Sequence, residues 1–458
     1  MPAEVRVPEH SVPVAAECDV LVCGGGPAGI ATAISAARHG CGVILLERWP
    51  SVGGMATNAL VNIWHTSDRE KQVIYGLVQE AIERGGRWVH RWSTFPKNFE
   101  THWFDPERMR VVFHQMLAEA GVRTFCNVVA GEPILGQTHE PCGACSAPVG
   151  RIRGVLADTK RGRRAFLARI VVDATGDGDV AAKAGLPFDY GRESDGRVQG
   201  MTMMYRLCGV DNERLKEFTT EEEAAVLAEM RALRDHGEFP PFNEGNTRLR
   251  GFRNRCIPNM CPVAGNPLDE EELTWLTARA REQVFRYLEF WRTRIPAMVN
   301  AEVEQTGFAL GVRESRRIRG RKTLTREMVV GAAKQPDAIG HGFWLIDIHD
   351  PQGTGYTTYH AFDPREMPPP GQSYHIPLGM CLNDHIPNLM VAGRCASSTH
   401  EGHASVRLQS HCMVMGQGVG TAAALALSQN VNPADVNVRD LQETLRKDGV
   451  YIEDVPEA

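Results

Sequence analysis

The sequence predicts an α/β fold in which a parallel sheet is flanked by helices and a second, mixed α+β domain is inserted. Three observations support this. The apolar run Cys18–Cys23, the helix-like segment Pro27–His39 and the apolar run Gly42–Leu46 follow one another, and this order requires a parallel strand pair with a right-handed crossover. A further strand-like run, Asn388–Ala392, returns near the C-terminal end. The length of 458 residues exceeds what one ordinary core supports.

The elements between these runs follow from the periodicity of their apolar residues. Spacings of three and four residues predict helices, whereas alternating or continuous apolar runs predict strands. The predicted helices are 68–84, 105–120, 220–236, 268–293 and 413–425. The predicted strands are 122–129, 152–158 and 165–173, with a loop over 131–150.

The composition changes beyond Gly185, where loops rich in Gly, Arg and Pro are followed by a segment rich in His, Tyr and Gly. Loops that carry polar and aromatic groups on a scaffold are where substrates usually bind. We therefore predict a discontinuous first domain over residues 1–186 and 376–458, and a substrate domain over residues 187–375.

Composition excludes several classes of protein. With 43% hydrophobic and 23% charged residues the chain is globular, and 50 Lys and Arg against 56 Asp and Glu give a net charge of −6. No basic surface for nucleic acid or an anionic membrane is expected, so the predicted partner is a small molecule. The N-terminal stretch has no basic and apolar leader, and the twelve scattered cysteines indicate reduced thiols. These features predict a cytoplasmic protein without a membrane span; the oligomeric state stays open.

A GxGxxG motif lies between the first predicted strand and helix. Gly24 permits a sharp turn, Gly26 permits the backbone to approach a pyrophosphate, and Gly29 permits close packing of helix on sheet. Glu47, at the end of the next strand, suits the hydroxyls of a ribose. The motif in this context predicts a Rossmann-like dinucleotide-binding domain.

Three segments together resemble a known family. They are VLVCGGGPAGIATAISAARHGCGVILLERWPSVGGMAT with its Gly53-Gly54 pair, VVDATGDGDVAAKAG at 171–185, and NLMVAGRCASSTHEGHASVRLQSHCMVMGQGVGTAAALA at 388–426. The chain resembles the FAD-dependent oxidoreductases of the glutathione-reductase-like class. The resemblance implies FAD as the cofactor and an FAD-binding first domain.

The motifs and the resemblance together predict the cofactor contacts. In the last segment, three glycines from Gly416 are expected to open an Ala-rich helix whose N-terminus faces the pyrimidine edge of the flavin, and Arg394 is expected to neutralise phosphate. The predicted FAD-binding residues are Gly24, Gly26, Pro27, Ala28, Gly29, Glu47, Arg48, Gly53, Gly54, Met55, Val129, Ala174, Thr175, Gly176, Asp177, Gly393, Arg394, Gly418, Val419 and Gly420.

Histidine supplies the candidates for acid–base catalysis because it changes charge near neutral pH. His400 and His403 rank first because they lie between the flavin-binding strand and the following helix. Arg407 and Tyr374 are the expected polar contacts to substrate, and His349 is the next candidate base.

The expected function is hydride transfer from a small organic substrate, at a C–O, C–N or activated C–C bond, to flavin N5. There is a single GxGxxG, so no second domain for NADPH is expected. Oxygen, a quinone or a protein is a possible external electron acceptor. Two alternatives stay open: a flavin-dependent reductase or monooxygenase fed by a separate reductase, and a non-catalytic FAD electron relay.

Two further patterns have competing interpretations. His139, Cys142 and Cys145 fit a zinc or redox site, but their place in a polar insertion favours an exposed loop, and no metal is expected. The string GVRESRRIRG, residues 311–320, is either a solvated helix face or an arginine clamp for an anionic or polyhydroxylated substrate or for the flavin phosphates.

Overall fold

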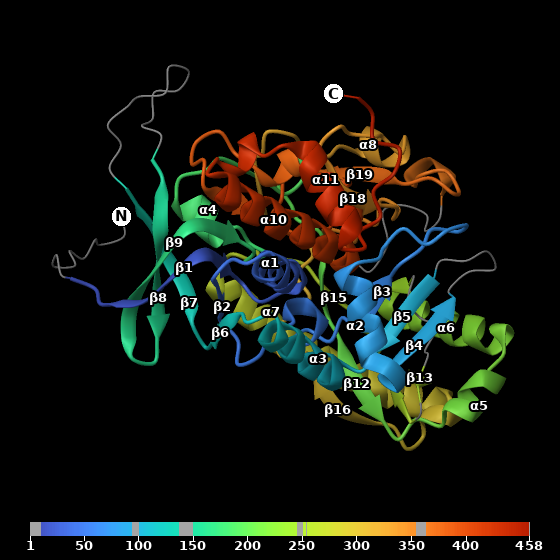
Figure 1. Ribbon diagram of the computed structural model, residues 1–458. Coiled ribbons are helices and arrows are strands. Elements are labelled where there is room, and N and C mark those ends of the chain that lie inside the picture. The colour runs from blue at the N-terminus through green and yellow to red at the C-terminus, as the bar shows by residue number, and fades with distance from the viewer. Residues whose placement is uncertain are drawn as a thin grey trace.

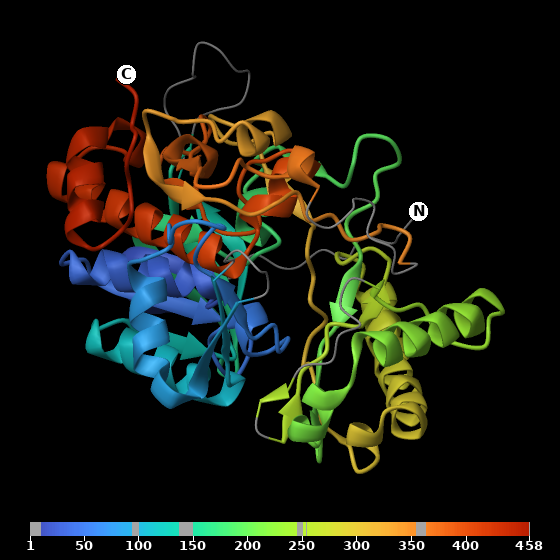
Figure 2. The same cartoon turned by 90° about the vertical axis from the view of Figure 1, so that its right-hand side faces the viewer.

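The computed structural model describes residues 11–93, 100–136, 150–244, 251–252, 254–353 and 363–457. His139, Cys142 and Cys145 of the predicted loop lie outside these residues. The chain forms a larger lobe around a central sheet and a smaller lobe beside it, which Figure 2 shows separated from one another at their outer ends. No helix in the described part of the chain has the length and apolar character needed to cross a bilayer.

The central sheet combines a parallel half with an antiparallel half. Its order is β6-β2-β1-β9-β8-β7, and β20 pairs with the C-terminal part of β9. The parallel strands are β1 (Val14–Cys23), β2 (Val43–Glu47), β6 (Arg123–Cys126), β9 (Gly162–Asp173) and β20 (Leu389–Val391). The antiparallel strands are β7 (Val129–Leu135) and β8 (Ile152–Thr159). The predicted α/β fold with its parallel sheet is therefore confirmed, although β7 extends into the predicted loop.

Helices α1 (Pro27–Arg38) and α10 (Gln409–Gln429) pack side by side, and α1 also lies on β1 and β2 of the central sheet (Figure 1). Two glycines of α10 make this contact possible. A Cβ atom at Gly416 would lie 2.1 Å from the carbonyl oxygen of Ala28, and one at Gly420 would lie 2.3 Å from that of Thr32. A Cβ at Gly418 would meet Ile339 on the other side.

This packing corrects one prediction. The helix begins at Gln409, not at Gly416, so Gly418, Val419 and Gly420 lie in its interior. Gly420 contacts α1 and Gly418 contacts Ile339, and the N-terminus of the helix is formed by residues 408–410 instead.

We predict that Gly416→Ala destabilises the protein. Alanine normally stabilises a helix by up to about 1 kcal/mol relative to glycine. Here the new Cβ would meet the backbone of α1 at 2.1 Å, and such overpacking costs about 1–3 kcal/mol. Thermal unfolding should show a lower Tm than wild type, whereas Ser428→Ala at the exposed end of the same helix should leave it unchanged. An unchanged Tm in Gly416→Ala would show that the two helices tolerate a wider spacing.

One predicted helix is shorter than its periodicity suggested. Only α2 (Leu77–Gly85) is helical within the predicted helix 68–84. The Asp68 side chain accepts the backbone N–H groups of Glu70 and Lys71, and Ser67 bridges to Gln72, so this part forms a tight turn. By contrast, α3 (Pro106–Glu119) begins as predicted, with Asp105 capping the N–H of Arg108.

The smaller lobe has its own hydrophobic core, built from residues between Met201 and Leu310. Residues from Ile318 to Ile376 pack instead into the core of the larger lobe, so the second core is shorter than the predicted second domain. The smaller lobe contains β11 (Met201–Met203), β12 (Tyr205–Cys208), α5 (Asn212–Glu217), α6 (Thr220–Asp235), β13 (Gly251–Phe252), β14 (Arg255–Cys256), β15 (Cys261–Val263), α7 (Glu270–Arg294) and β16 (Glu302–Thr306).

The remaining elements complete the larger lobe and the connection between lobes. A small antiparallel sheet has the order β3-β5-β4, and two further strand pairs are β10-β17 and β18-β19. The bounds are β3 (Ile63–His65), β4 (Val89–Ser93), β5 (Glu100–Phe104), α4 (Asp179–Lys183), β10 (Phe188–Tyr190), β17 (Arg316–Ile318), α8 (Arg326–Val330), β18 (Ala338–Gly342), β19 (Tyr374–Pro377), α9 (His400–Val406) and α11 (Val438–Lys447).

Candidate cofactor and substrate site

A cavity of about 660 Å³ brings together residues from the central sheet and from the smaller lobe. Its first end is formed by the glycine turn after β1, the end of β2, the turn after β9 and the segment after β20. Its other end is formed by Thr202, Met204, Ile257, Pro258, Asn259, Gly311, Val312, Arg313, Trp344, Leu345, Asp347, His349, Arg407, Ile63, His65 and Trp103.

The glycine turn has the geometry that the motif requires. Gly24 has φ +108°, and a Cβ there would lie 2.3 Å from the carbonyl oxygen of Ala174. A Cβ at Gly29 would lie 1.9 Å from the Gly24 carbonyl oxygen, so helix and strand meet too closely for a side chain. At Gly26 only the Cα of Gly54 lies within 4.0 Å of the Cβ position, and Gly26 lines the cavity. The turn is therefore open where a pyrophosphate would approach.

Glu47 is held rigidly at the cavity wall. Its carboxylate accepts the N–H of Gly25 at 2.7 Å and the N–H of Trp49 at 2.8 Å. The residue is only 4% exposed, and burial raises the pKa of its carboxyl group above the usual range. Each carboxylate oxygen keeps a lone pair for a further donor such as a ribose hydroxyl.

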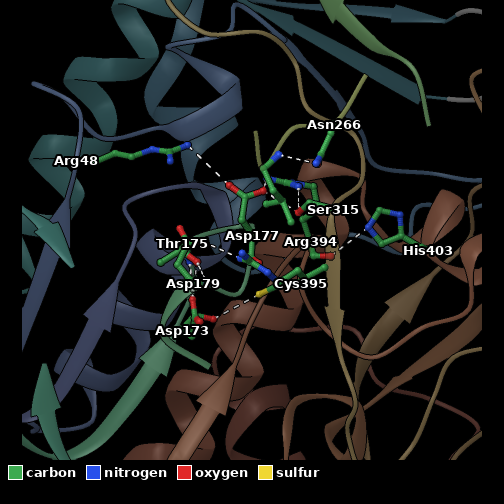
Figure 3. Close-up of polar contacts among 12 residues, drawn as sticks. Arg48, Asp173, Thr175, Asp177, Asp179, Asn266, Ser315, Arg394, Cys395 and His403 are labelled. Carbon is green, nitrogen blue, oxygen red and sulfur yellow. Dashed lines mark hydrogen bonds and ion pairs between the residues drawn. The ribbon is translucent and has the colours of Figure 1, made fainter. Parts of the chain in front are cut away.

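A charged cluster lies beneath the turn after β9 (Figure 3). The Asp177 carboxylate accepts hydrogen bonds from Arg394 Nη2 at 2.8 Å and from the Ser315 hydroxyl at 2.7 Å, and Arg48 Nη2 lies 4.0 Å away. Burial acts to raise the pKa of Asp177, but Arg394, Ser315 and Arg48 lower it overall. An ionised Asp177 thus holds two arginines that line the cavity, and Ser315 is a member of the cluster that the motifs did not reveal.

The turn itself is fixed by Asp173 at the end of β9. Its carboxylate accepts the N–H of Thr175 at 3.0 Å, the Thr175 hydroxyl at 2.7 Å and the N–H of Ala181 at 2.8 Å. These bonds hold Thr175 and Gly176 against the cavity.

Most of the predicted FAD-binding residues line this cavity. They are Gly24, Gly26, Pro27, Ala28, Glu47, Arg48, Gly54, Met55, Val129, Ala174, Thr175, Gly176, Gly393 and Arg394. Six predicted residues do not line the cavity and instead pack behind its wall: Gly29, Gly53, Asp177, Gly418, Val419 and Gly420. Gly53, for example, has φ +116° and packs on Thr57.

The start of α10 offers polar atoms without partners. Gln409 Oε1 and Ser410 Oγ are buried and accept or donate no hydrogen bond within the described structure, and both residues line the cavity. Buried polar groups are normally satisfied, so these atoms fit a bound polar group. Together with the open glycine turn and the placed acid, the wall fits a flavin dinucleotide.

Three of the predicted catalytic residues, His400, His403 and Tyr374, do not line the cavity, which corrects the expectation that the two histidines are placed for catalysis there. His400 Nδ1 lies 2.9 Å from the buried carboxylate of Glu314, and His403 Nε2 lies 3.0 Å from the Arg394 carbonyl oxygen (Figure 3). The Tyr374 hydroxyl bonds that of Ser405 at 2.8 Å in the core. Helix α9, which Thr399 caps, directs these histidines away from the cavity.

His349 and Arg407 do line the cavity, and Asp347 joins them. Arg407 Nη2 donates to the Asp347 carbonyl oxygen at 2.8 Å and to its Oδ2 at 3.3 Å, and His349 Nε2 lies 3.5 Å from the same Oδ2. Burial and Arg313 lower the pKa of His349 to about 4, against the opposing effect of Asp347. His349 is therefore neutral near pH 7 and able to accept a proton.

His65 is a further cavity residue that the sequence did not single out. Its ring stacks on Trp344 with centroids 3.9 Å apart, and its Nδ1 lies 3.1 Å from the Thr101 hydroxyl. Burial lowers the pKa of His65 to about 3. The described residues contain no group of three or more His, Cys, Asp or Glu side chains arranged to hold a metal ion.

Comparisons with known proteins agree with this geometry. A family model described as FAD dependent oxidoreductase matches residues 19–445. The digeranylgeranylglycerophospholipid reductase 1 of Methanopyrus kandleri is 30% identical over 182 residues, which cover 37% of this chain and 43% of that protein. The match thus spans less than half the length of this curated relative.

Two solved structures are similar to this chain at low identity. A geranylgeranyl bacteriochlorophyll reductase-like protein from Thermoplasma acidophilum is 13% identical, with a TM-score of 0.47, over 94% of this chain and 83% of its own. The p-nitrophenol 4-monooxygenase of Pseudomonas putida is 11% identical, with a TM-score of 0.46, over 96% and 90% of the two chains. Because the family model spans nearly the whole chain and the cavity has the walls that the cofactor needs, this protein belongs to the FAD-dependent oxidoreductase family and is an enzyme with FAD as its cofactor.

Proposed function

We propose that the protein oxidises a small organic substrate, with hydride transfer from a C–O, C–N or activated C–C bond to flavin N5. The observation that carries this proposal is the position of Asp347, His349 and Arg407, which share one cavity with the glycine turn and Glu47. Bound FAD would supply the hydride acceptor. The protein would supply position, a proton acceptor and charge.

The cofactor-binding residues follow from the cavity wall. The backbone at Gly24 and Gly26 would lie along the pyrophosphate, Glu47 would bind the ribose, and Arg48 and Arg394 would offset phosphate charge. The start of α10 would face the pyrimidine edge, with the free atoms of Gln409 and Ser410 as contacts. We infer the glutathione-reductase-like class from this βαβ unit and from the Gly53-Gly54 pair that follows the acid.

His349 is the proposed general base. In the proposed tautomer Nε2–H faces Asp347, so the proton of a substrate hydroxyl or amine would pass to Nδ1. Asp347 would then stabilise the imidazolium, and Arg407, which bonds Asp347 twice, keeps this carboxylate in place. Arg407 is thus a positioning residue in this proposal.

The test is anaerobic mixing of the holoenzyme with a panel of alcohols, amines and saccharides. At least one class should bleach the visible absorbance of the flavin, and NADPH alone should bleach it slowly because the chain has a single GxGxxG. Oxygen, a quinone or a protein would then reoxidise the reduced flavin. Rapid bleaching by NADPH with no response to the panel would overturn the proposal and favour the reductase or monooxygenase. No bleaching by either would favour the electron relay.

A further inference from the structure

Arg313 is fixed at the wall of the cavity by the smaller lobe. The segment that carries it pairs with β11, where Gly311 and Thr202 exchange backbone hydrogen bonds. This pairing places Arg313 Nη1 2.7 Å from the carbonyl oxygen of Gly200 and 2.7 Å from the Thr202 hydroxyl, and Nη2 3.4 Å from Asn259 Oδ1. The guanidinium therefore has a defined position and orientation.

The partners of this guanidinium are all neutral. Among the described residues three acceptors engage Arg313 and none of them is a carboxylate. A guanidinium has five N–H groups, so the contacts leave donors on Nη2 and Nε for a ligand. A buried charge without a counter-ion is costly, and burial, helped by Arg407, lowers the pKa of Arg313 to about 9.

The nearby carboxylate does not balance this charge. Asp347 already accepts from Arg407 and faces His349. Among the described residues that line the cavity here, Arg313 and Arg407 have one carboxylate, Asp347, between them, so with His349 neutral these side chains together carry one net positive charge. The other two carboxylates of the wall lie elsewhere: Glu47 accepts backbone N–H groups, and Asp179 accepts from Arg316.

The wall around Arg313 is otherwise largely apolar. Its members include Met204, Ile257, Pro258, Val312, Trp344 and Leu345. A ligand that fits here pairs one negative group with an apolar body, because a fully polar ligand would leave these side chains without contacts.

We propose that the substrate carries a carboxylate on an apolar body and that this carboxylate binds Arg313. That this ligand is the substrate rests on the oxidation proposed above. The carboxylate and the apolar body then define the class of molecule that is oxidised. The carboxylate would accept from Nη2 and Nε of Arg313 and so replace the missing counter-ion. The body would lie on the apolar wall, with the bond to be oxidised toward His349.

The test measures binding without turnover. We would titrate two carboxylates, benzoate and octanoate, and their neutral amides, benzamide and octanamide, into the oxidised holoenzyme by calorimetry. The same titrations are repeated with Arg313→Gln and Arg313→Lys. Arg279→Gln, on the exposed surface of α7, is the control. At least one carboxylate should bind wild type and the control at least about tenfold more tightly than its amide. Arg313→Gln should weaken carboxylate binding by roughly 10- to 100-fold and leave amide binding unchanged, with Arg313→Lys between the two.

Flavin content and midpoint potential, measured on the same variants, separate a substrate contact from a cofactor contact. Both should be unchanged in Arg313→Gln. Equal binding of acid and amide, no binding of either carboxylate to wild type, or loss of flavin from Arg313→Gln would overturn the proposal. If the substrate panel fails to bleach the flavin while Arg313-dependent carboxylate binding persists, the oxidation is wrong and the anion site stands. If neutral alcohols bleach the flavin of Arg313→Gln at wild-type rates, the proposed oxidation stands and the proposal that the substrate carries a carboxylate is wrong.

Discussion

Replacing Gly26 with leucine is expected to abolish FAD binding while the chain still folds. Gly26 has φ −76°, which any residue adopts, and its Cβ position meets only the Gly54 Cα at 4.0 Å. A leucine side chain would therefore extend into the cavity, where the pyrophosphate of the cofactor approaches the backbone. The purified variant should be colourless, with no flavin released on denaturation, and its far-UV circular dichroism should match that of wild-type apoprotein.

Two comparisons make this result specific. Gly136→Leu adds the same side chain away from the cavity, where the Cβ has only ordinary contacts, and should keep its flavin. Gly24→Leu is not a suitable comparison, because its Cβ would lie 2.3 Å from the Ala174 carbonyl oxygen and would damage the fold itself. A yellow Gly26→Leu protein with full flavin content would contradict the assignment of this turn to the cofactor.

Local patterns predicted the part of the fold that local forces determine. The strand–turn–helix–strand unit follows from buried apolar runs and glycines over thirty consecutive positions. Helix α1 and strand β2 lie within one residue of their predicted bounds, and β1 begins four residues before its predicted start. The predicted helix 68–84 was wrong over its first half, since the Asp68 side chain captures two backbone N–H groups that a helix would need. The spacing of apolar residues does not reveal such a turn, because the turn depends on hydrogen bonds of a polar side chain.

The glycines of α10 show a second limit. Glycine at a helix start and glycine at a helix–helix contact look alike in sequence, because both follow from the absence of a Cβ. Only the approach of α1, which lies nearly four hundred residues earlier in the chain, shows that Gly416 and Gly420 are contact residues.

The arginine string 311–320 divides among roles that the sequence could not separate. Arg319 is exposed and pairs with Asp189 at the surface, but residues 316–318 form strand β17, so the string is not the helix face of the solvated interpretation. Arg316 is partly buried and pairs with Asp179 of the cavity wall. Arg317 is buried against the Glu314 carboxylate, whereas Arg313 lines the cavity. The segment runs between the two lobes, so successive side chains enter different surroundings.

The candidate base illustrates the same difficulty. His400 and His403 are near the flavin-binding strand in sequence, but the direction of a side chain depends on where its helix begins, and the cap at Thr399 turns both inward. His349 enters the cavity from the segment after β18 (Ala338–Gly342), about forty residues before that strand in the sequence. Proximity along the chain therefore selected the wrong histidines for the cavity wall.

His349→Gln is expected to lower the rate of flavin reduction by substrate roughly 10²- to 10⁴-fold, the usual contribution of a positioned base, with flavin content unchanged. In wild type the pKa of His349 is lowered to about 4, so the neutral base predominates above that pH. The wild-type rate should therefore rise as pH increases through about 4 and stay level from about pH 5 upward, and the variant should lack this step. Anaerobic stopped-flow measurement of flavin absorbance across pH gives both quantities.

His236→Gln, on the exposed end of α6, is the matched control and should reduce at the wild-type rate. His400→Gln and His403→Gln test the order that the sequence suggested. Neither ring lines the cavity, and His400 is engaged by Glu314, so their loss should affect stability more than the chemical step. The assignment of His349 would be contradicted if His400→Gln or His403→Gln keeps its flavin but reduces it slowly, while His349→Gln reduces its flavin at the wild-type rate. The base would then lie on α9, and His349 would only contact Asp347.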